Sequence, residues 1–166
     1  LRSGVDRLLI RGWGASEILF ITDTADGNYG DDVNLFNPNG LSGVIPQDPP
    51  QNAVIDVDTA EWVYNKDVAL PEIGVDATAD IVAILDGLKQ NVCSMINEQI
   101  VGRDYFSTPD NVPELSGTVA DWEATIAAGT ITSSVAGDAT KMEGKAFLCV
   151  ENGDGNYVYY HALVEN

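Results

Sequence analysis

Residues 145–164 read KAFLCVENGDGNYVYYHALV and decide how this chain folds. Two apolar and aromatic runs, 145–150 and 157–164, flank a turn of Asn, Gly and Asp residues at 152–156. Runs of this kind around a short turn rich in Gly and Asn are typical of a β-hairpin. We therefore predict that the chain ends in two antiparallel strands.

A long helix is predicted upstream, from Thr78 to Gly102. Thr78 is a suitable N-cap, and Asp80 would lie in the first turn, where an acidic side chain is favourable. Gly102 stands where a left-handed C-cap residue belongs. Between them, apolar residues recur at helical spacing: Ile81, Ile84, Leu85, Leu88, Val92, Met95, Ile96 and Ile100. Cys93 borders this apolar face.

A second helix is predicted over residues 1–21, running into an apolar segment. Its apolar face is formed by Val5, Leu8, Leu9 and Trp13. Gly12 and Gly14 weaken the middle of this helix. Residues 18–21 are apolar on all sides, which fits a buried helix end or a short buried strand.

The remaining chain contains short strands and long loops. Residues 23–52 are rich in Gly, Pro, Asn and Asp and predict a long irregular connection. Short strands are predicted at 54–57 and 60–64. Residues 103–144 are rich in turn residues, with one further strand at 130–134.

Cys93 and Cys149 are the two cysteines of the chain. Neither has a neighbour at zinc-binding spacing, so we expect no metal site there. A disulfide would join the central helix to the final hairpin and add about 4 kcal/mol of stability. Two reduced thiols in a cytosolic protein are the alternative. The predicted fold is a single α+β domain of residues 1–166, with the two helices packed on an antiparallel sheet.

Composition excludes several functions. The chain has 166 residues, with 26 Asp and Glu against 8 Lys and Arg, for a net charge of −18. Such a surface repels phosphate backbones and anionic lipids, which argues against nucleic-acid binding and electrostatic membrane docking. No apolar run approaches the roughly 20 residues that a membrane span requires. The chain has one histidine, so it lacks most of the residues that metal-dependent and triad hydrolases use. We therefore expect that this protein is not an enzyme.

Several short motifs resemble those of bacterial prepilin-type proteins. They are Trp13-x-x-Ser16-Glu17-Ile18-Leu19-Phe20, Phe36-Asn37-Pro38-Asn39-Gly40, Val92-Cys93-x-x-Ile96-Asn97 and Tyr157-x-Tyr159-Tyr160-His161-Ala162-Leu163. The predicted layout of N-terminal helix, long loop, antiparallel sheet and late disulfide also resembles that of type IV pilin-like proteins and pseudopilins. The long apolar N-terminal helix that defines this family is not within residues 1–166. The resemblance implies that the natural gene encodes it before Leu1.

The resemblance implies an exported structural subunit that assembles non-covalently with identical or related pilin subunits. Residues 1–21 would be the remnant of the long helix, and residues 22–166 would form a periplasmic or extracellular head on the filament surface. The membrane would be contacted only through the upstream helix, and no cofactor would be required. The residues expected to serve assembly are Val5, Leu8, Leu9 and Trp13.

Two acidic or polar loops are candidates for calcium binding. Asp23, Asp26, Asp31 and Asp32 lie close together in one loop, and calcium prefers about six to eight oxygen ligands. Their spacing does not match an EF-hand, and a solvated acidic loop is the alternative. The hairpin turn Asn152-x-Asp154-x-Asn156 also alternates oxygen-bearing side chains, although a hairpin turn explains its composition.

The final strand offers an aromatic face. Tyr157, Tyr159 and His161 share one side of it by alternation and could stack on sugars or contact a neighbouring subunit; packing within the sheet is the alternative. With calcium in the acidic loop, this face gives an alternative function, a secreted calcium-dependent carbohydrate-binding module. His161 has no accompanying nucleophile motif, so catalysis is not expected. A weak candidate for a glycosidase-like carboxylate pair is the cluster of Asp56, Asp58 and Glu61.

Overall fold

The chain forms two compact units, residues 1–48 and 49–166, which we call unit 1 and unit 2. Unit 1 contains the N-terminal helix and the loop that follows it, and unit 2 contains the remaining chain. The computed structural model describes residues 1–56, 59–74, 80–115, 129–130, 133–152 and 155–164.

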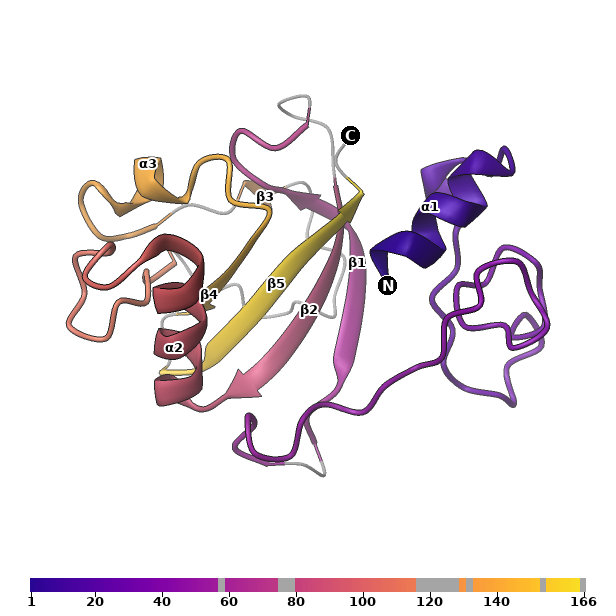
Figure 1. Ribbon diagram of the computed structural model, residues 1–166, viewed down its shortest axis with the longest axis horizontal. Helices are drawn as coiled ribbons and strands as arrows, with labels where there is room; N and C mark the ends of the chain where they lie inside the picture. The colour runs from indigo at the N-terminus through magenta and orange to yellow at the C-terminus, as the bar shows by residue number, and fades with distance from the viewer. Residues whose placement is uncertain (57–58, 75–79, 116–128, 131–132, 153–154, 165–166) are drawn as a thin grey trace. The chain divides into compact units, whose positions relative to one another are not determined.

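Unit 2 is built on a five-stranded sheet in the order β3-β1-β2-β5-β4 (Figure 1). Neighbouring strands are antiparallel except for the parallel pair β1 and β3. The strands are β1 (Trp62–Ala69), β2 (Asp80–Leu88), β3 (Gly129–Thr130), β4 (Phe147–Glu151) and β5 (Tyr157–Val164). Together with the helices described below, this sheet confirms the α+β class.

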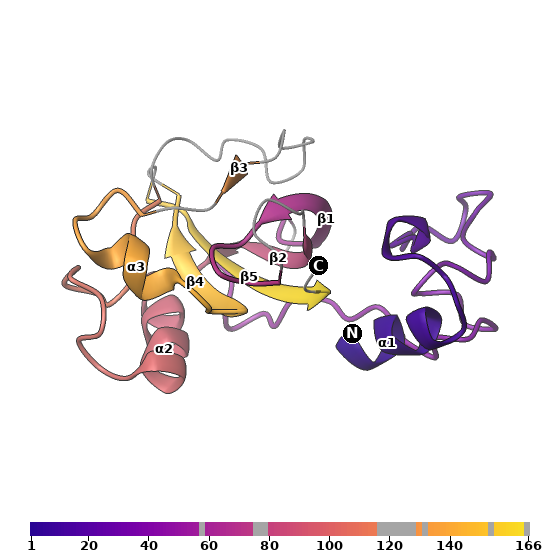
Figure 2. The ribbon, with the colours of Figure 1, turned by 90° about the horizontal axis from the view of Figure 1, so that it is seen from above.

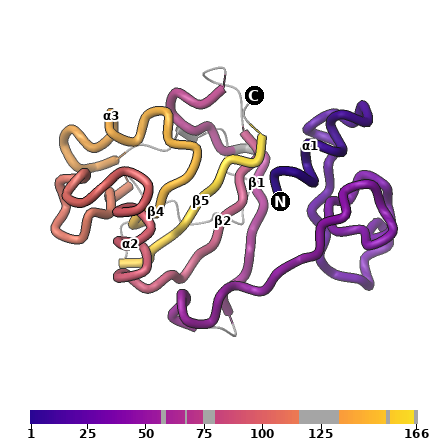
Figure 3. The backbone as a smooth tube through the Cα atoms, in the orientation of Figure 1, coloured from indigo at the N-terminus to yellow at the C-terminus, as the bar shows by residue number. Residues whose placement is uncertain are grey.

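The predicted C-terminal hairpin is confirmed by β4 and β5, which run side by side (Figure 3). Their register pairs Phe147 with His161 and Glu151 with Tyr157. Because β5 also pairs with β2, it lies inside the sheet, and β4 forms one edge.

The sheet buries apolar side chains on both faces. Face A packs against loop residues and the short helix α3 (Asp138–Met142). Its buried residues include Val82, Ile84, Phe106, Leu115, Met142, Leu148, Val150, Val158 and Tyr160. Face B packs against α2 (Gln90–Val101), and its buried residues include Leu85, Leu88, Cys93, Val112, Cys149 and Tyr157. Alternation along the strands sends neighbouring side chains to opposite faces.

The prediction of a helix from Thr78 to Gly102 is wrong for the first half of this segment. Residues Asp80–Leu88 form β2, and only Gln90–Val101 are helical. Thr78 lies outside the described residues. Asp80, expected in a first helical turn, is the first residue of β2, where its buried carboxylate accepts a hydrogen bond from the Leu70 N–H (3.1 Å).

Burial on both faces of β2 explains this error. A strand covered on both sides reads as a continuous apolar run, and over a short window such a run resembles a buried helix. The register of β2 against β5 shifts between Leu85 and Leu88, and Gly87 has a φ of 69° there. This bulge places Leu85 and Leu88 on the same face although they are three residues apart, which imitates helical spacing.

The second half of the predicted helix is confirmed. Helix α2 ends at Val101, and Gly102 follows it with a φ of 95° and a ψ of 167°, a conformation that glycine adopts easily but that is not the predicted left-handed helical one. The helix lies on one side of the sheet (Figure 2). The predicted disulfide is also confirmed: Cys93 on α2 is bonded to Cys149 on β4, with their Cα atoms 5.3 Å apart.

Unit 1 begins with a helix shorter than predicted. Helix α1 spans Arg2–Ile10, and a single 3-10 turn, η1, follows at Ala15–Glu17. Gly12 has a φ of 95°, which interrupts the helical backbone, so the helix does not reach residue 21. Residues 18–21 form neither helix nor strand, apart from one bridge between Leu19 and Asn34.

The shorter predicted strands are confirmed in part. The strand expected at 60–64 is present as β1, which begins at Trp62 and continues to Ala69. The strand expected at 54–57 is reduced to one bridge between Val54 and Leu88, and residue 57 lies outside the described residues. The strand expected at 130–134 corresponds to β3, which covers Gly129–Thr130, and residues 131–132 also lie outside them.

Candidate functional site

The four residues predicted to serve assembly differ in their burial. Val5 and Leu8 are completely buried, whereas Leu9 and Trp13 are only half-buried. The folded chain itself therefore removes Val5 and Leu8 from solvent.

Other apolar side chains of unit 1 are exposed. Ile10, at the end of α1, is 84% exposed, and Ile45 is 71% exposed. The backbone of Gly4 on α1 approaches Val44 so closely that a Cβ at Gly4 would overlap it, so α1 packs against the segment that carries Ile45. Of the seven large apolar side chains exposed in the described residues, four lie in unit 1: Leu1, Ile10, Leu41 and Ile45.

The four aspartates of the acidic loop are all exposed. Asp23 Oδ1 accepts a hydrogen bond from the Ala25 N–H, and Asp26 Oδ1 accepts one from the Asn28 N–H, each at 2.8 Å. These are Asx turns, in which a carboxylate fixes its own backbone. No group of three or more His, Cys, Asp or Glu residues suited to a metal ion occurs in the part of the chain that the structure describes.

Two buried asparagines organise the same loop. Asn34 donates to the carbonyls of Ile21 (3.1 Å) and Tyr29 (2.8 Å), and its Oδ1 accepts from the Ile21 N–H (3.0 Å). Asn37 donates to the carbonyls of Gly30 (2.7 Å) and Asp31 (3.1 Å). These four backbone carbonyl oxygens, which could otherwise coordinate a calcium ion, thus already accept hydrogen bonds from side-chain amides.

The hairpin turn, the other calcium candidate, is closed by a backbone hydrogen bond and anchored to β2 by a side-chain hydrogen bond. The Asn152 N–H donates to the Asn156 carbonyl (3.0 Å), and Asn156 Nδ2 donates to Asp86 Oδ1 (2.6 Å). Asn152 Oδ1 is buried and has no hydrogen-bond partner within the described residues. Asp154 lies outside these residues.

Carboxylates gather beside this turn. The pKa of Glu151 is raised, first by burial and then by the negative charges of Glu114 and Asp110, whereas a hydrogen bond from the Gly155 backbone lowers it. Tyr157 donates its hydroxyl to Asp110 Oδ2 (3.2 Å), and burial together with the charge of Asp110 raises the pKa of Tyr157 to about 12. Burial and the nearby negative charges therefore both disfavour the ionised form of Glu151.

The aromatic residues on face B pack against each other. Tyr159 lies edge-on to Trp62, with ring centroids 6.3 Å apart, and its hydroxyl is 3.3 Å from Nδ1 of His161. His161 in turn stacks at a tilt on Phe147, at 5.2 Å. The faces and edges of these rings thus contact one another within the sheet. In the weaker carboxylate cluster, Asp56 and Glu61 are exposed, and Asp58 lies outside the described residues.

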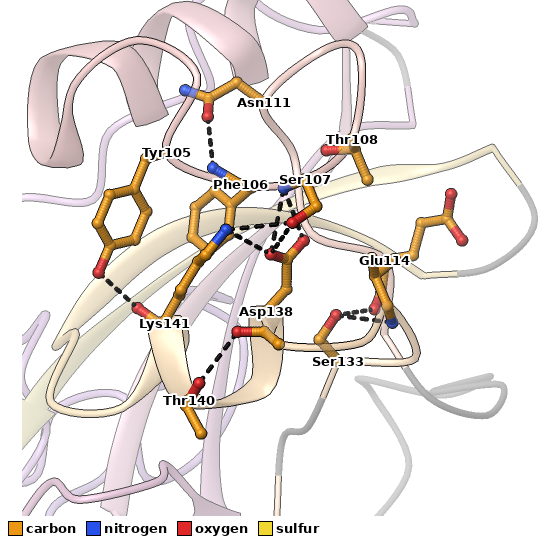
Figure 4. Close-up of polar contacts among 12 residues, drawn as sticks. Tyr105, Phe106, Ser107, Thr108, Asn111, Glu114, Ser133, Asp138, Thr140 and Lys141 are labelled. Atoms are coloured by element: carbon orange, nitrogen blue, oxygen red, sulfur yellow. Dashed lines mark hydrogen bonds and ion pairs between the residues drawn. The ribbon is translucent and has the colours of Figure 1, made fainter.

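A polar cluster that the sequence did not predict connects α3 to the loop after α2 (Figure 4). Asp138 is completely buried and accepts hydrogen bonds from the N–H (3.0 Å) and the hydroxyl (3.0 Å) of Ser107. Lys141 forms an ion pair with Asp138 (3.0 Å) and donates to Ser107 Oγ (3.1 Å). The Ser107 hydroxyl thus donates to the Asp138 carboxylate and accepts from the Lys141 ammonium group, an arrangement that connects this loop to α3.

The buried side-chain amide of Asn97 forms hydrogen bonds next to the disulfide. Asn97, on the same face of α2 as Cys93, bonds both backbone groups of Cys149 and the carbonyl of Asn111. The spacing of four residues between Cys93 and Asn97 was visible in the sequence, but the partner on β4 was not.

The comparisons with known proteins identify no relative of this chain. No family model, no curated protein and no solved structure matches it. Among the described residues, no helix is long and apolar enough to span a membrane. The function must therefore be inferred from the geometry of the chain itself.

Proposed function

We propose that this chain is the head domain of a filament-forming subunit, similar to a type IV pilin or pseudopilin, and that its role is structural. The observation that carries the proposal is the exposure of apolar side chains in unit 1, above all Ile10 and Ile45. In a chain with a net charge of −18, exposed apolar residues favour contact with another protein.

The disulfide supports a place outside the cytoplasm. Such bonds persist in oxidising compartments such as the periplasm and the extracellular space. A strongly acidic head would keep subunits soluble before assembly and face water afterwards. The proposal therefore includes a surface position on an extracellular or periplasmic filament.

The test uses the natural gene, including whatever it encodes before Leu1. We expect an apolar helix there, and filaments visible by negative-stain electron microscopy when the whole protein is expressed in its host. Ile10→Asp should reduce filament number at least tenfold, because it places a charge at the proposed contact. Ile55→Asp is the matched control, since Ile55 is 66% exposed but lies in unit 2.

Either of two results would overturn the proposal. One is a natural sequence in which a cleaved secretory signal ends next to Leu1. The other is equal filament formation by Ile10→Asp and Ile55→Asp.

The alternative of a calcium-dependent carbohydrate-binding module has less support. The carboxylates of Asp23 and Asp26 cap their own turns, and Asn34 and Asn37 occupy neighbouring carbonyls. We expect equal melting temperatures in calcium and in chelator. A rise of several degrees with calcium would favour the alternative.

A further inference from the structure

Helix α2 contacts β4 through two side chains on the same helical face, Cys93 and Asn97. Residues four apart lie one above the other on a helix. Both side chains reach the same residue of β4, Cys149, one through a disulfide and the other through an amide. All three residues are completely buried.

The amide of Asn97 closes the free edge of β4 at Cys149. Its Nδ2 donates to the Cys149 carbonyl (2.8 Å), and its Oδ1 accepts from the Cys149 N–H (2.9 Å). Both backbone groups of Cys149 therefore point away from β5, as alternate residues of an edge strand do. Nδ2 also donates to the Asn111 carbonyl (3.0 Å), so both N–H groups of the amide have an acceptor.

We infer that Asn97 docks α2 on β4 without help from the disulfide. The three hydrogen bonds involve no sulfur atom, and the apolar contacts of α2 on face B do not need the bond either. The two thiols are thus held next to each other in the reduced chain, and oxidation locks a contact that already exists. On this account docking of the helix is insensitive to the redox state.

The oxidation itself is an ordinary thiol–disulfide exchange. Two protein thiols lose two electrons and two protons, and one glutathione disulfide takes them up to become two glutathione thiols. If α2 is docked beforehand, the effective concentration of one thiol at the other is high, and the equilibrium favours the protein disulfide. If the disulfide is instead what holds α2 on the sheet, the equilibrium constant for forming the disulfide is smaller and does not depend on Asn97.

The first test needs no substitution. The protein is reduced in denaturant, refolded in a phosphine reductant, and followed by amide hydrogen exchange with NMR detection. The Cys149 amide should remain protected, because its acceptor is Asn97 and not a sheet neighbour. Fast exchange at Cys149 with continued protection at Val150 would overturn the inference, as would a reduced chain that fails to fold.

The second test measures the equilibrium with glutathione. Asn97→Ala should lower the equilibrium constant for forming the protein disulfide at least tenfold relative to Asn91→Ala. Asn91 is a matched control, because it is the same residue type on an exposed position of the same helix. Protection of Val150 in reduced Asn97→Ala checks that its sheet is intact. Equal constants for the two variants would contradict the inference.

Discussion

The two units of this chain combine apolar burial and side-chain hydrogen bonds in different ways. In unit 2, five strands bury apolar side chains on both faces, and a disulfide joins α2 to the sheet edge. In unit 1, Asn34 and Asn37 form seven hydrogen bonds with backbone groups of a loop that lacks regular structure. Both units bury apolar side chains, including Leu35 and Phe36 in unit 1, but the loop of unit 1 is ordered by buried amides and the chain of unit 2 by a sheet.

The comparison also explains why only part of the molecule was predictable. A hairpin is encoded by local alternation and turn residues, so β4 and β5 could be read directly. The bonds of Asn34 and Asn37 join residues up to 13 positions apart without any periodicity, and no sequence pattern reveals them. The resemblance motif containing Asn37 and the one containing Asn97 included the relevant residues but did not indicate their partners.

The largest effect should come from the core of unit 2. Tyr160 is completely buried on face A, and its hydroxyl donates to the Lys145 carbonyl (3.3 Å). Tyr160→Ala should lower the free energy of unfolding by about 4 kcal/mol, measured by urea denaturation, because it leaves a large cavity. Tyr160→Phe keeps the ring and should cost only about 1 kcal/mol. Equal losses in the two variants would show that ring burial is not the main contribution.

The second-largest loss of stability should come from removing the disulfide. Cys93→Ser should lower the free energy of unfolding by up to about 4 kcal/mol, mainly because the unfolded chain gains freedom. Urea denaturation measures this loss, and non-reducing mass spectrometry of the parent protein should show a mass two hydrogens below the reduced form. Two free thiols in protein exported under oxidising conditions would contradict the prediction.

A smaller effect is expected from the amide network of unit 1. Asn34→Ala leaves the Ile21 N–H and the Ile21 and Tyr29 carbonyls without their partner, which should cost about 2 kcal/mol. Residue-resolved NMR during urea denaturation would report this loss in unit 1. Asn28→Ala is the control, since Asn28 is exposed. If both variants unfold at the same urea concentration, Asn34 does not stabilise the loop.

The smallest effect concerns the carboxylates at the hairpin. Because the pKa of Glu151 is raised in the folded protein, the folded state holds the proton more tightly than the unfolded state. The stability that protonated Glu151 contributes is therefore fully present when the pH is below the pKa of Glu151 in the unfolded chain. It is lost as the pH rises through the pKa of Glu151 in the folded protein. Glu151→Gln should stabilise the protein at pH 7 by less than about 1 kcal/mol, since the side chain is partly exposed to water.

Melting temperatures at two pH values would test this prediction. The gain from Glu151→Gln should be present at pH 7 and disappear below the pKa of the unfolded side chain. Glu143→Gln, which changes an exposed glutamate outside this cluster, is the control. A gain that persists unchanged in acid would rule out the ionisation of Glu151 as its cause.

The contrast between the units depends most directly on whether side-chain amides hold the loop of unit 1. The exchange rate of the Ile21 amide hydrogen measures this, because its acceptor is Asn34 Oδ1 at 3.0 Å. We predict slow exchange in the parent protein and exchange at the rate of an unstructured peptide in Asn34→Ala, with the β5 amides protected in the parent as a reference. Exchange at Ile21 that is already fast in the parent protein would contradict the account.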